Sequence, residues 1–214
     1  MPVPDSDLLS IDALRYDLRI VASWISPKSK VLGLGCGEGE LLCYLKHQKK
    51  ALCTGIDQDE SKVAICIQRG LSVLQGDINS EVQDYRDNAF DFVILSQTLQ
   101  QIYSPETLID DILRIGKKCI VSFPNFSHWG NRLQLMFKGH APISKQLPYQ
   151  WYNTPNIRVI TIKDFQRFAR QMGLVIYKEV TINTQNQEKA GKIIRFLPNI
   201  RSTYGLYLVG RSHS

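Results

Sequence analysis

The hydrophobic residues of this chain fall into short apolar runs, and the segments between those runs have helical periodicity. The apolar runs are rich in Val, Ile and Leu and end close to glycine or aspartate, as β-strands do. Phe90–Leu95 is apolar on successive residues, which is typical of a strand covered on both faces. The predicted strands in this part of the chain are 30–34, 51–56, 72–75, 90–95 and 118–123.

Helix signals separate these strands. Pro105 suits a first helical position after a cap at Ser104, and Gly116 suits the end of that helix. Thr161 and Asp164 form a start that resembles a capping box, with Asp in place of the usual Glu or Gln. The predicted helices are 8–24, 38–47, 60–69, 105–115 and 162–172.

The end of the chain has a different pattern. Two further strands, 174–182 and 204–209, are predicted on either side of the polar loop TQNQEKAGK. Residues 124–158 form an irregular insertion rich in aromatic residues, which is longer than a loop without a function usually is. The alternation of strands and helices predicts an α/β fold with a doubly wound parallel sheet. We expect one domain over 1–214, with its ligand crevice at the carboxyl ends of the strands.

Composition narrows the class of protein. The formal net charge is +6, and its excess lies mostly late in the chain. A basic surface could bind nucleic acid, but such charges more often form a solvated face, so we do not expect nucleic-acid binding. We also expect no membrane segment, because no apolar run approaches the ~20 residues that a membrane span needs. The start, MPVPDSDLLS, lacks the basic segment of a secretory signal.

Five cysteines occur singly in apolar segments, and no CxxC pair is present. This pattern predicts buried thiols in a reducing compartment, and hence a cytoplasmic protein without a metal site.

A glycine-rich turn is the first candidate for a ligand site. After the strand 30–34 the sequence reads GLGCGEG, and Gly35 and Gly37 would let the backbone approach a ligand closely. Asp57 ends the next strand about twenty residues on, where a carboxylate can accept two ribose hydroxyls.

Two later strand ends complete this candidate site. Asp77 and Ile78 follow the third strand and could contact an adenine, whereas Ser96 and Gln97 follow the fourth, near the reactive group of a ligand. Either acid could instead be a helix cap or a loop residue, and Ser96 could bond only to backbone. The order of these features on successive strands favours a ligand that contains adenosine.

The spacing of the glycines indicates which of the ligands that contain adenosine this turn would bind. Dinucleotide sites use GxGxxG, whereas this turn reads GxGxGxG, and Glu38 would repel a phosphate. A cationic ligand without phosphate, S-adenosyl-L-methionine, is therefore favoured. The pattern resembles the class I methyltransferases, which implies a Rossmann-like fold with a seven-stranded, mostly parallel sheet, a reversed last strand and helices on both faces.

Four longer segments resemble one particular family. They are LGCGEGELLCYL, ILSQTLQQIYSPE, IVSFPNFSHWGNRLQLMFKG and LPYQWYNTPNIRVITIKDF. They look like the methionine biosynthesis protein W (MetW) family, over about Leu18 to Gly173. The resemblance implies a role in methionine synthesis beside a homoserine O-acyltransferase partner. Carried over by motif, it places Gly35, Cys36 and Gly37 in the cofactor loop. It implies no methyl acceptor.

Gly33 departs from the family pattern, which has an acid at this position to orient the amino-acid part of the cofactor. Loss of a charge-assisted contact costs roughly 1.5–3 kcal/mol, which weakens binding about ten- to a hundredfold. His128 could serve as a general base because its unperturbed pKa is close to neutrality. The alternative is a structural histidine bonded to a loop carbonyl. No other catalytic group is predicted.

The leading hypothesis is a MetW-like protein that binds S-adenosyl-L-methionine and acts through an acyltransferase. The alternative is an active methyltransferase on a small-molecule acceptor. The aromatic residues and arginines of the 124–158 insertion are typical of protein interfaces. We expect this insertion to be a partner surface, a pocket lid, or both.

Overall fold

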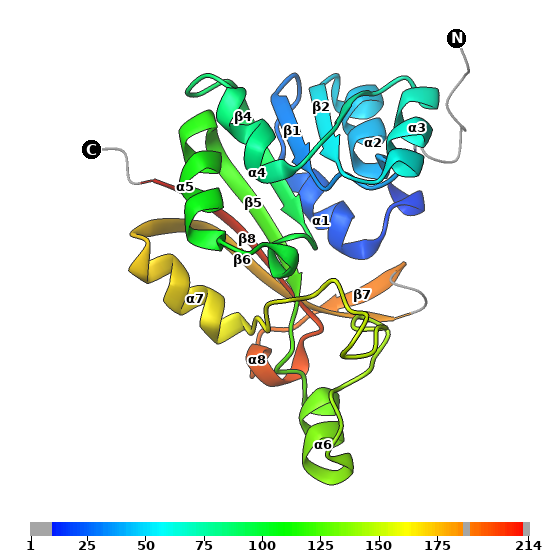
Figure 1. Ribbon diagram of the computed structural model, residues 1–214, viewed down its shortest axis with the longest axis vertical. Helices are drawn as coiled ribbons and strands as arrows, with labels where there is room; N and C mark the ends of the chain where they lie inside the picture. Colours follow the sequence, from blue (N-terminus) through cyan, green and yellow to red (C-terminus); the bar gives the residue numbers. More distant parts are fainter. Residues whose placement is uncertain (1–9, 186–188, 212–214) are drawn as a thin grey trace.

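A sheet of eight strands in the order β3-β2-β1-β4-β5-β8-β6-β7 forms the centre of the computed structural model (Figure 1). The structure describes residues 10–185 and 189–211. β1 to β5 are parallel, whereas β8 is antiparallel to both of its neighbours, β5 and β6. The strands are β1 Lys30–Leu34, β2 Leu52–Asp57, β3 Ser72–Gln75, β4 Phe90–Ser96, β5 Gly116–Pro124, β6 Leu174–Gln185, β7 Ala190–Ile193 and β8 Tyr204–Arg211.

Helices cover both faces of the sheet. The α-helices are α1 Tyr16–Trp24, α2 Glu40–Lys49, α3 Glu60–Gln68, α4 Ile78–Glu81, α5 Pro105–Ile115, α6 Trp129–Lys138, α7 Ile162–Gln171 and α8 Pro198–Arg201. Short 3-10 turns are η2 Ile11–Ala13, η3 Val82–Asp84 and η4 Leu99–Gln101. None of the helices in the described ranges is long and apolar enough to cross a membrane.

The alternation of side chains along each strand builds two separate cores. In β4, Val93 and Leu95 pack with α5 and α7, whereas Phe92 and Ile94 pack with α1 and α2. This arrangement explains why β4 is apolar on successive residues, as the sequence indicated. The Rossmann-like class and the reversed last strand are confirmed.

The sheet has one strand more than the seven expected. β6 and β7 form a hairpin where the sequence predicted a polar loop, and Gln185 pairs with Ala190. That prediction was wrong on both sides of Asn186–Glu188, which lie outside the described residues. β7 is an edge strand that pairs by its backbone and is largely exposed, so its side chains carry no apolar signal.

The predicted helix over 8–24 is broken. Leu14 is extended (φ −71°, ψ 146°), and α1 begins only at Tyr16. The guanidinium of Arg19 holds the break by donating to the carbonyl oxygens of Leu14 at 2.9 Å and Asp12 at 2.6 Å. Leu14 still reaches the core, and Arg15 is left at the start of α1.

The caps of the later helices are partly as predicted. Thr161 Oγ1 accepts from the backbone N–H of Asp164 at 3.1 Å and donates to its carboxylate at 2.6 Å, which confirms the capping interaction. Pro105 begins α5 as expected, but the side chain of Ser104 makes no capping hydrogen bond. Proline at the first position leaves one N–H fewer to cap.

The 124–158 insertion is less irregular than predicted. It contains α6, which stands apart from the sheet at the bottom of Figure 1. The segment after α6 returns to the molecule through loops and ends near Arg158, whose backbone N–H donates to the carbonyl of Gln100 at 2.9 Å. The insertion is therefore fastened to the turn that follows β4.

Candidate cofactor-binding site

A continuous cleft lies at the carboxyl ends of β1, β2, β3 and β4. It consists of two cavities of about 280 and 550 Å³, which share Gly35, Gly37, Ser96 and Gln97. Every residue predicted to bind a cofactor lines one or both cavities: Gly35, Cys36, Gly37, Asp57, Asp77, Ile78, Ser96 and Gln97. The structure thus brings together residues from four separate strand ends.

The glycine turn after β1 needs its glycines for two different reasons. Gly35 and Gly37 both have positive φ, +64° and +57°, a region that other residues rarely adopt. A Cβ on Gly35 would lie 2.6 Å from Thr98 Oγ1, whereas one on Gly37 would meet nothing within 4 Å. Gly35 therefore permits packing against Thr98, and Gly37 presents bare backbone to the cleft.

Asp57 joins this turn to the end of β2. Its Oδ2 accepts from the N–H of Gly37 at 2.7 Å, and its Oδ1 accepts from the N–H of Asp59 at 3.0 Å. The residue is only 8% exposed, yet it lines the larger cavity. Because each carboxylate oxygen can accept more than one hydrogen bond, Asp57 retains acceptor capacity for a ligand diol.

Asp77 and Ile78 border the larger cavity beyond β3. Asp77 caps α4, and its Oδ1 accepts from the N–H of Asn79 at 3.1 Å and from Gln58 Nε2 at 3.3 Å. Asp77 therefore has both roles: it caps α4, which the sequence analysis left open as an alternative, and it lines the cleft. Ile78 is 5% exposed and supplies an apolar wall.

Ser96 and Gln97 end β4 where the two cavities meet. Ser96 Oγ lies 3.0 Å from Ser122 Oγ, so its partner is a side chain of β5. Gln97 has a positive φ of +55°, an uncommon conformation for a residue with a side chain. Its N–H donates to Ser122 O at 2.8 Å, and its Nε2 donates to Asp17 Oδ2 at 3.1 Å.

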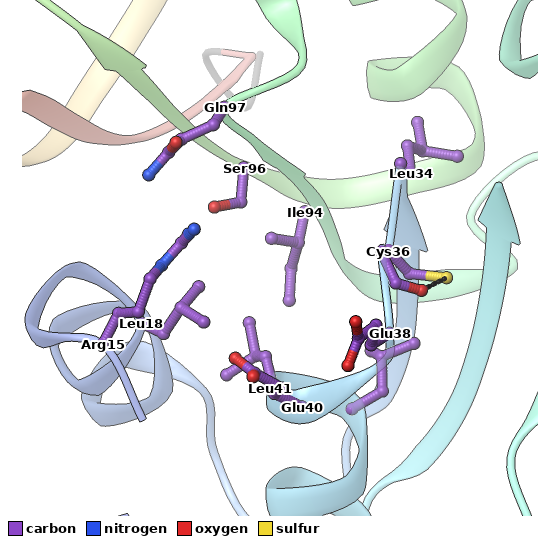
Figure 2. Close-up of a pocket in the computed structure, with 14 residues that line it drawn as sticks. Arg15, Leu18, Leu34, Cys36, Glu38, Glu40, Leu41, Ile94, Ser96 and Gln97 are labelled. Carbon is purple, nitrogen blue, oxygen red and sulfur yellow. Dashed lines mark hydrogen bonds between the residues drawn. The ribbon is translucent and has the colours of Figure 1, made fainter. Parts of the chain in front are cut away.

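The smaller cavity carries charges of both signs. Figure 2 shows Arg15, Ser96 and Gln97 on one side and two acids on the other, Glu38 in the glycine turn and Glu40 at the first position of α2. Gly33 lies in the wall, and a Cβ there would touch Leu42 at 3.2 Å. Leu42 thus fills part of the space beside Gly33, the position where the resemblance predicted an acid.

Cys36 is protonated under ordinary conditions. A hydrogen bond with Cys66, together with burial, raises the pKa of the Cys36 thiol. The five cysteines are free thiols, of which Cys43, Cys66 and Cys119 are buried. The prediction of buried thiols is confirmed for these three, whereas Cys36 and Cys53 are only partly buried.

His128, the predicted base, lines neither cavity of the cleft. It caps α6, where its Nδ1 accepts from the N–H of Gly130 at 3.3 Å, so its partner is a backbone donor and not the loop carbonyl considered above. Its Nε2 is buried without a partner among the described residues, and burial lowers the pKa of the ring. This geometry fits a neutral structural histidine.

The sequence patterns missed several residues of the cleft. Arg15 comes from the break before α1, Glu40 from the first position of α2, and Thr98 from the turn after β4. A lone arginine and a lone threonine carry no signal of a site, but Glu40 directly follows the glycine turn, within the quoted segment LGCGEGELLCYL, and could have been considered.

Comparison with known proteins identifies the family. Residues 15–209 match the family model of methionine biosynthesis protein MetW. The chain belongs to the MetW family. The bifunctional methionine biosynthesis protein MetXA/MetW of Rhodopirellula baltica is 31% identical over 188 residues, covering 84% of this chain. The chain spans only 30% of that relative's length.

Solved structures share the fold of this MetW-family chain. A SAM-dependent methyltransferase from Archaeoglobus fulgidus is similar with a TM-score of 0.69 and 14% identity, over 94% of both chains. The magnesium protoporphyrin IX methyltransferase of Synechocystis, solved with bound SAH, has a TM-score of 0.63 and 18% identity, over 91% of this chain and 82% of its own. At these identities the likeness establishes the class I methyltransferase fold.

The contact between Gly35 and Thr98 gives a testable prediction. Gly35→Ala should lower the free energy of unfolding by roughly 2–4 kcal/mol, because it adds a clash to the cost of positive φ. Gly37→Ala should cost only about 1–2 kcal/mol, because its Cβ enters open space. Urea unfolding measures both.

The clash is isolated by adding Thr98→Ala, which removes the two nearest atoms. The double variant should be more stable than the sum of the two single effects predicts. Strict additivity would contradict the packing role of Gly35.

Proposed function

We propose that the cleft binds S-adenosyl-L-methionine and that this MetW-family protein serves methionine biosynthesis in the cytoplasm, together with a homoserine O-acyltransferase. The observation that carries the ligand assignment is the placement of Asp57. Its buried carboxylate stands at the end of β2 and fixes the glycine turn of β1, within one cleft. The free thiols agree with a reducing compartment.

The residues of the larger cavity fit the adenosine part of this ligand. Asp57 would accept hydrogen bonds from the ribose hydroxyls, and the open backbone at Gly37 leaves room for close approach. Asp77 and Ile78 would meet the edge and the face of the adenine. This arrangement disfavours a pyrophosphate, because Asp57, Asp59 and Asp77 all border the cavity and the lysine that lines it, Lys62, is paired with Asp59 at 3.4 Å.

The smaller cavity would hold the amino-acid part. Glu38 is paired with Arg69 at 3.5 Å, but Glu40 has no hydrogen bond or ion pair among the described residues. We infer that Glu40 supplies the negative charge that the family takes from the position of Gly33. Arg15, on the opposite wall, would meet the carboxylate of the ligand.

The ribose assignment predicts a defined loss. Asp57→Asn should weaken binding of S-adenosyl-L-methionine about ten- to a hundredfold, because a charge-assisted contact is worth roughly 1.5–3 kcal/mol. Asp110→Asn, on α5 outside the cleft, is the control. Titration calorimetry on protein stripped of ligand measures both, with circular dichroism to verify that each variant is folded. Equal affinities in the two folded variants would contradict the assignment.

If Glu40 supplies the negative charge of the smaller cavity, an acid placed at position 33 should replace it. Glu40→Gln should weaken binding at least tenfold, and Gly33→Asp should restore it in the same chain, because the charge returns to the same cavity. Glu60→Gln is the matched control, since Glu60 is likewise the first residue of its helix but lies outside the cleft. Calorimetry again provides the readout.

If Gly33→Asp does not restore binding, contact between the added Cβ and Leu42 is a second explanation for that result. The same exchange in a Leu42→Ala background removes that obstacle. If binding stays weak there too, Glu40 does not replace the missing acid.

The partner surface is proposed on the 124–158 insertion. α6 exposes Leu135, Met136 and Phe137, whose exposed fractions are 59, 67 and 74%. Beside them lies a mostly apolar cavity of about 500 Å³, between α6 and the returning loop. Exposed apolar side chains flanked by Arg132 and Lys138 are typical of protein interfaces. The joining of MetXA and MetW in the R. baltica relative supports an acyltransferase as the partner.

This surface can be tested without touching the cleft. Phe137→Glu should weaken binding to the homoserine O-acyltransferase of the same organism at least tenfold, because it places a charge in an apolar contact. Ile67→Glu, on the exposed face of α3, is the control, with 58% of Ile67 exposed. Surface plasmon resonance or calorimetry compares the two variants. Equal loss, or no loss, would remove α6 from the interface.

A further inference from the structure

The turn that follows β4 forms one wall of the larger cavity of the cleft. The lining residues of this turn are Ser96, Gln97, Thr98, Gln101, Ile102 and Tyr103. Its first part is tied to the sheet, because Thr98 Oγ1 donates to Leu34 O at 3.3 Å. The side chain of Ile102 packs in the core, but the described hydrogen bonds of residues 100–103 lead to the turn itself and to the insertion, and none leads to a strand.

Arg158, at the end of the insertion, donates hydrogen bonds to three carbonyls of this turn. Its backbone N–H donates to Gln100 O at 2.9 Å. Its guanidinium donates through Nε to Ile102 O at 3.3 Å and through Nη2 to Tyr103 O. Among the residues that the structure describes, these are the hydrogen bonds that join the insertion to the turn. A planar guanidinium can reach two neighbouring carbonyls at once, which suits it to this position better than an ammonium group.

Tyr103 shows why this attachment matters to the cleft. It lines the larger cavity, yet it is 78% exposed, whereas Ile102 beside it is only 5% exposed. Packing therefore holds Ile102 but does little to hold Tyr103, and the bond from Arg158 fixes the backbone of the exposed residue. A wall that is ordered before the ligand arrives favours binding, because less conformational freedom is lost on association.

Two cavities beside the turn show that it is not packed tightly against its surroundings. A polar cavity of about 320 Å³ lies beside Gln97 and Arg15, between this turn and Tyr149 and Asn156 of the insertion. An apolar cavity of about 170 Å³ lies between the turn and α7 and is lined by Arg158 itself. Because segments separated by such spaces make few packing contacts, the connection between the turn and the insertion depends on the donors of Arg158.

Arg158 also lies close to the proposed partner surface. Two residues further on, Ile160 O accepts from Phe126 N–H at 3.1 Å, which joins the start of the insertion to the segment after its end. Phe126 and Val159 both line the apolar cavity beside α6. A displacement of that cavity wall therefore reaches Arg158 directly, because Val159 is its neighbour in the chain.

We propose that Arg158 is a positioning residue for the cofactor cleft, through which the insertion sets the affinity of the cleft for its ligand. Arg158 lines neither cavity of the cleft, so it acts through the carbonyls of Ile102 and Tyr103 and not by touching the ligand. The inference rests on the proposed binding of S-adenosyl-L-methionine. It gives the insertion a role in that binding besides its proposed role as a partner surface.

Arg158→Met in the full chain tests the guanidinium, because it keeps the aliphatic part of the side chain and the backbone bond to Gln100. We expect its affinity for S-adenosylhomocysteine to fall at least tenfold in titration calorimetry. Methylthioadenosine lacks the amino-acid part, and its affinity should fall by the same factor, because the wall belongs to the larger cavity. The matched control is Arg167→Met, which changes an exposed arginine of α7 outside the cleft and should leave both affinities unchanged.

Arg158→Lys separates positioning from stability. Its single ammonium donor should recover part of the affinity that Arg158→Met loses, whereas a purely structural Arg158 would lower the Tm of both variants and leave their affinities unchanged. Circular dichroism verifies that each variant is folded. If Arg158→Met does not fold, the milder Arg158→Lys is compared with Arg167→Met and should bind both ligands more weakly by one common factor.

The inference is overturned if the folded Arg158 variants bind both ligands as Arg167→Met does, or if only the affinity for S-adenosylhomocysteine falls. It is also overturned if Arg158→Lys binds no more tightly than a folded Arg158→Met. A loss in Asp57→Asn without a loss in Arg158→Met would remove Arg158 alone and leave the proposed function standing. Absence of binding by the unmodified chain would overturn the proposed function, and this inference with it.

Discussion

The hydrogen bonds that converge on the carboxylate of Asp57 and on the carbonyl of Ile56 are the constraint on which the site depends. Gly35 and Cys36 donate to Ile56 O at 2.9 and 3.1 Å, and Gly37 donates to Asp57 at 2.7 Å. Three successive peptide groups are thus tied to the end of the neighbouring strand. The turn can make these bonds only because Gly35 and Gly37 accept positive φ. Asp57 both orders the glycine turn and faces the cleft. Its structural role therefore cannot be separated from its proposed role in binding.

The N-terminal break has a comparable effect at the other end of the cleft. A continuous helix over 8–24 would carry Arg15 within its second turn, whereas the observed break leaves it as the cap of α1. There the guanidinium pairs with Asp17, which is fully buried and also receives Gln97 Nε2. A buried carboxylate without such partners would be costly, so the ion pair and the amide bond stabilise one another. Arg15 consequently stands between two cavities with its position fixed.

The sequence was sufficient for those parts of the site that depend on local chain properties. Strand ends, the glycine turn and the acids at Asp57 and Asp77 are encoded by short patterns, and the structure unites them because carboxyl ends of parallel strands meet at one edge. Arg15, Thr98 and Gln100 could not be predicted in the same way, because their place depends on contacts between distant segments. β7 and α6 were missed since edge strands and exposed helices carry little apolar periodicity towards a core.

The insertion links the two surfaces that remain outside the cofactor cleft. Tyr149 and Asn156 line both the apolar cavity beside α6 and the polar cavity beside Gln97. The loop that carries them is fastened to the turn after β4 by Arg158, and through Gln97 to the cleft itself. Because the two cavities share these side chains, a change in their position on one side changes the lining of the other, and coupling of this kind is reciprocal. In this architecture, the proposed cofactor cleft and the proposed protein-binding surface on the insertion are connected through an intermediate cavity that shares lining side chains with each of them, and such a connection is a physical requirement for coupling the two.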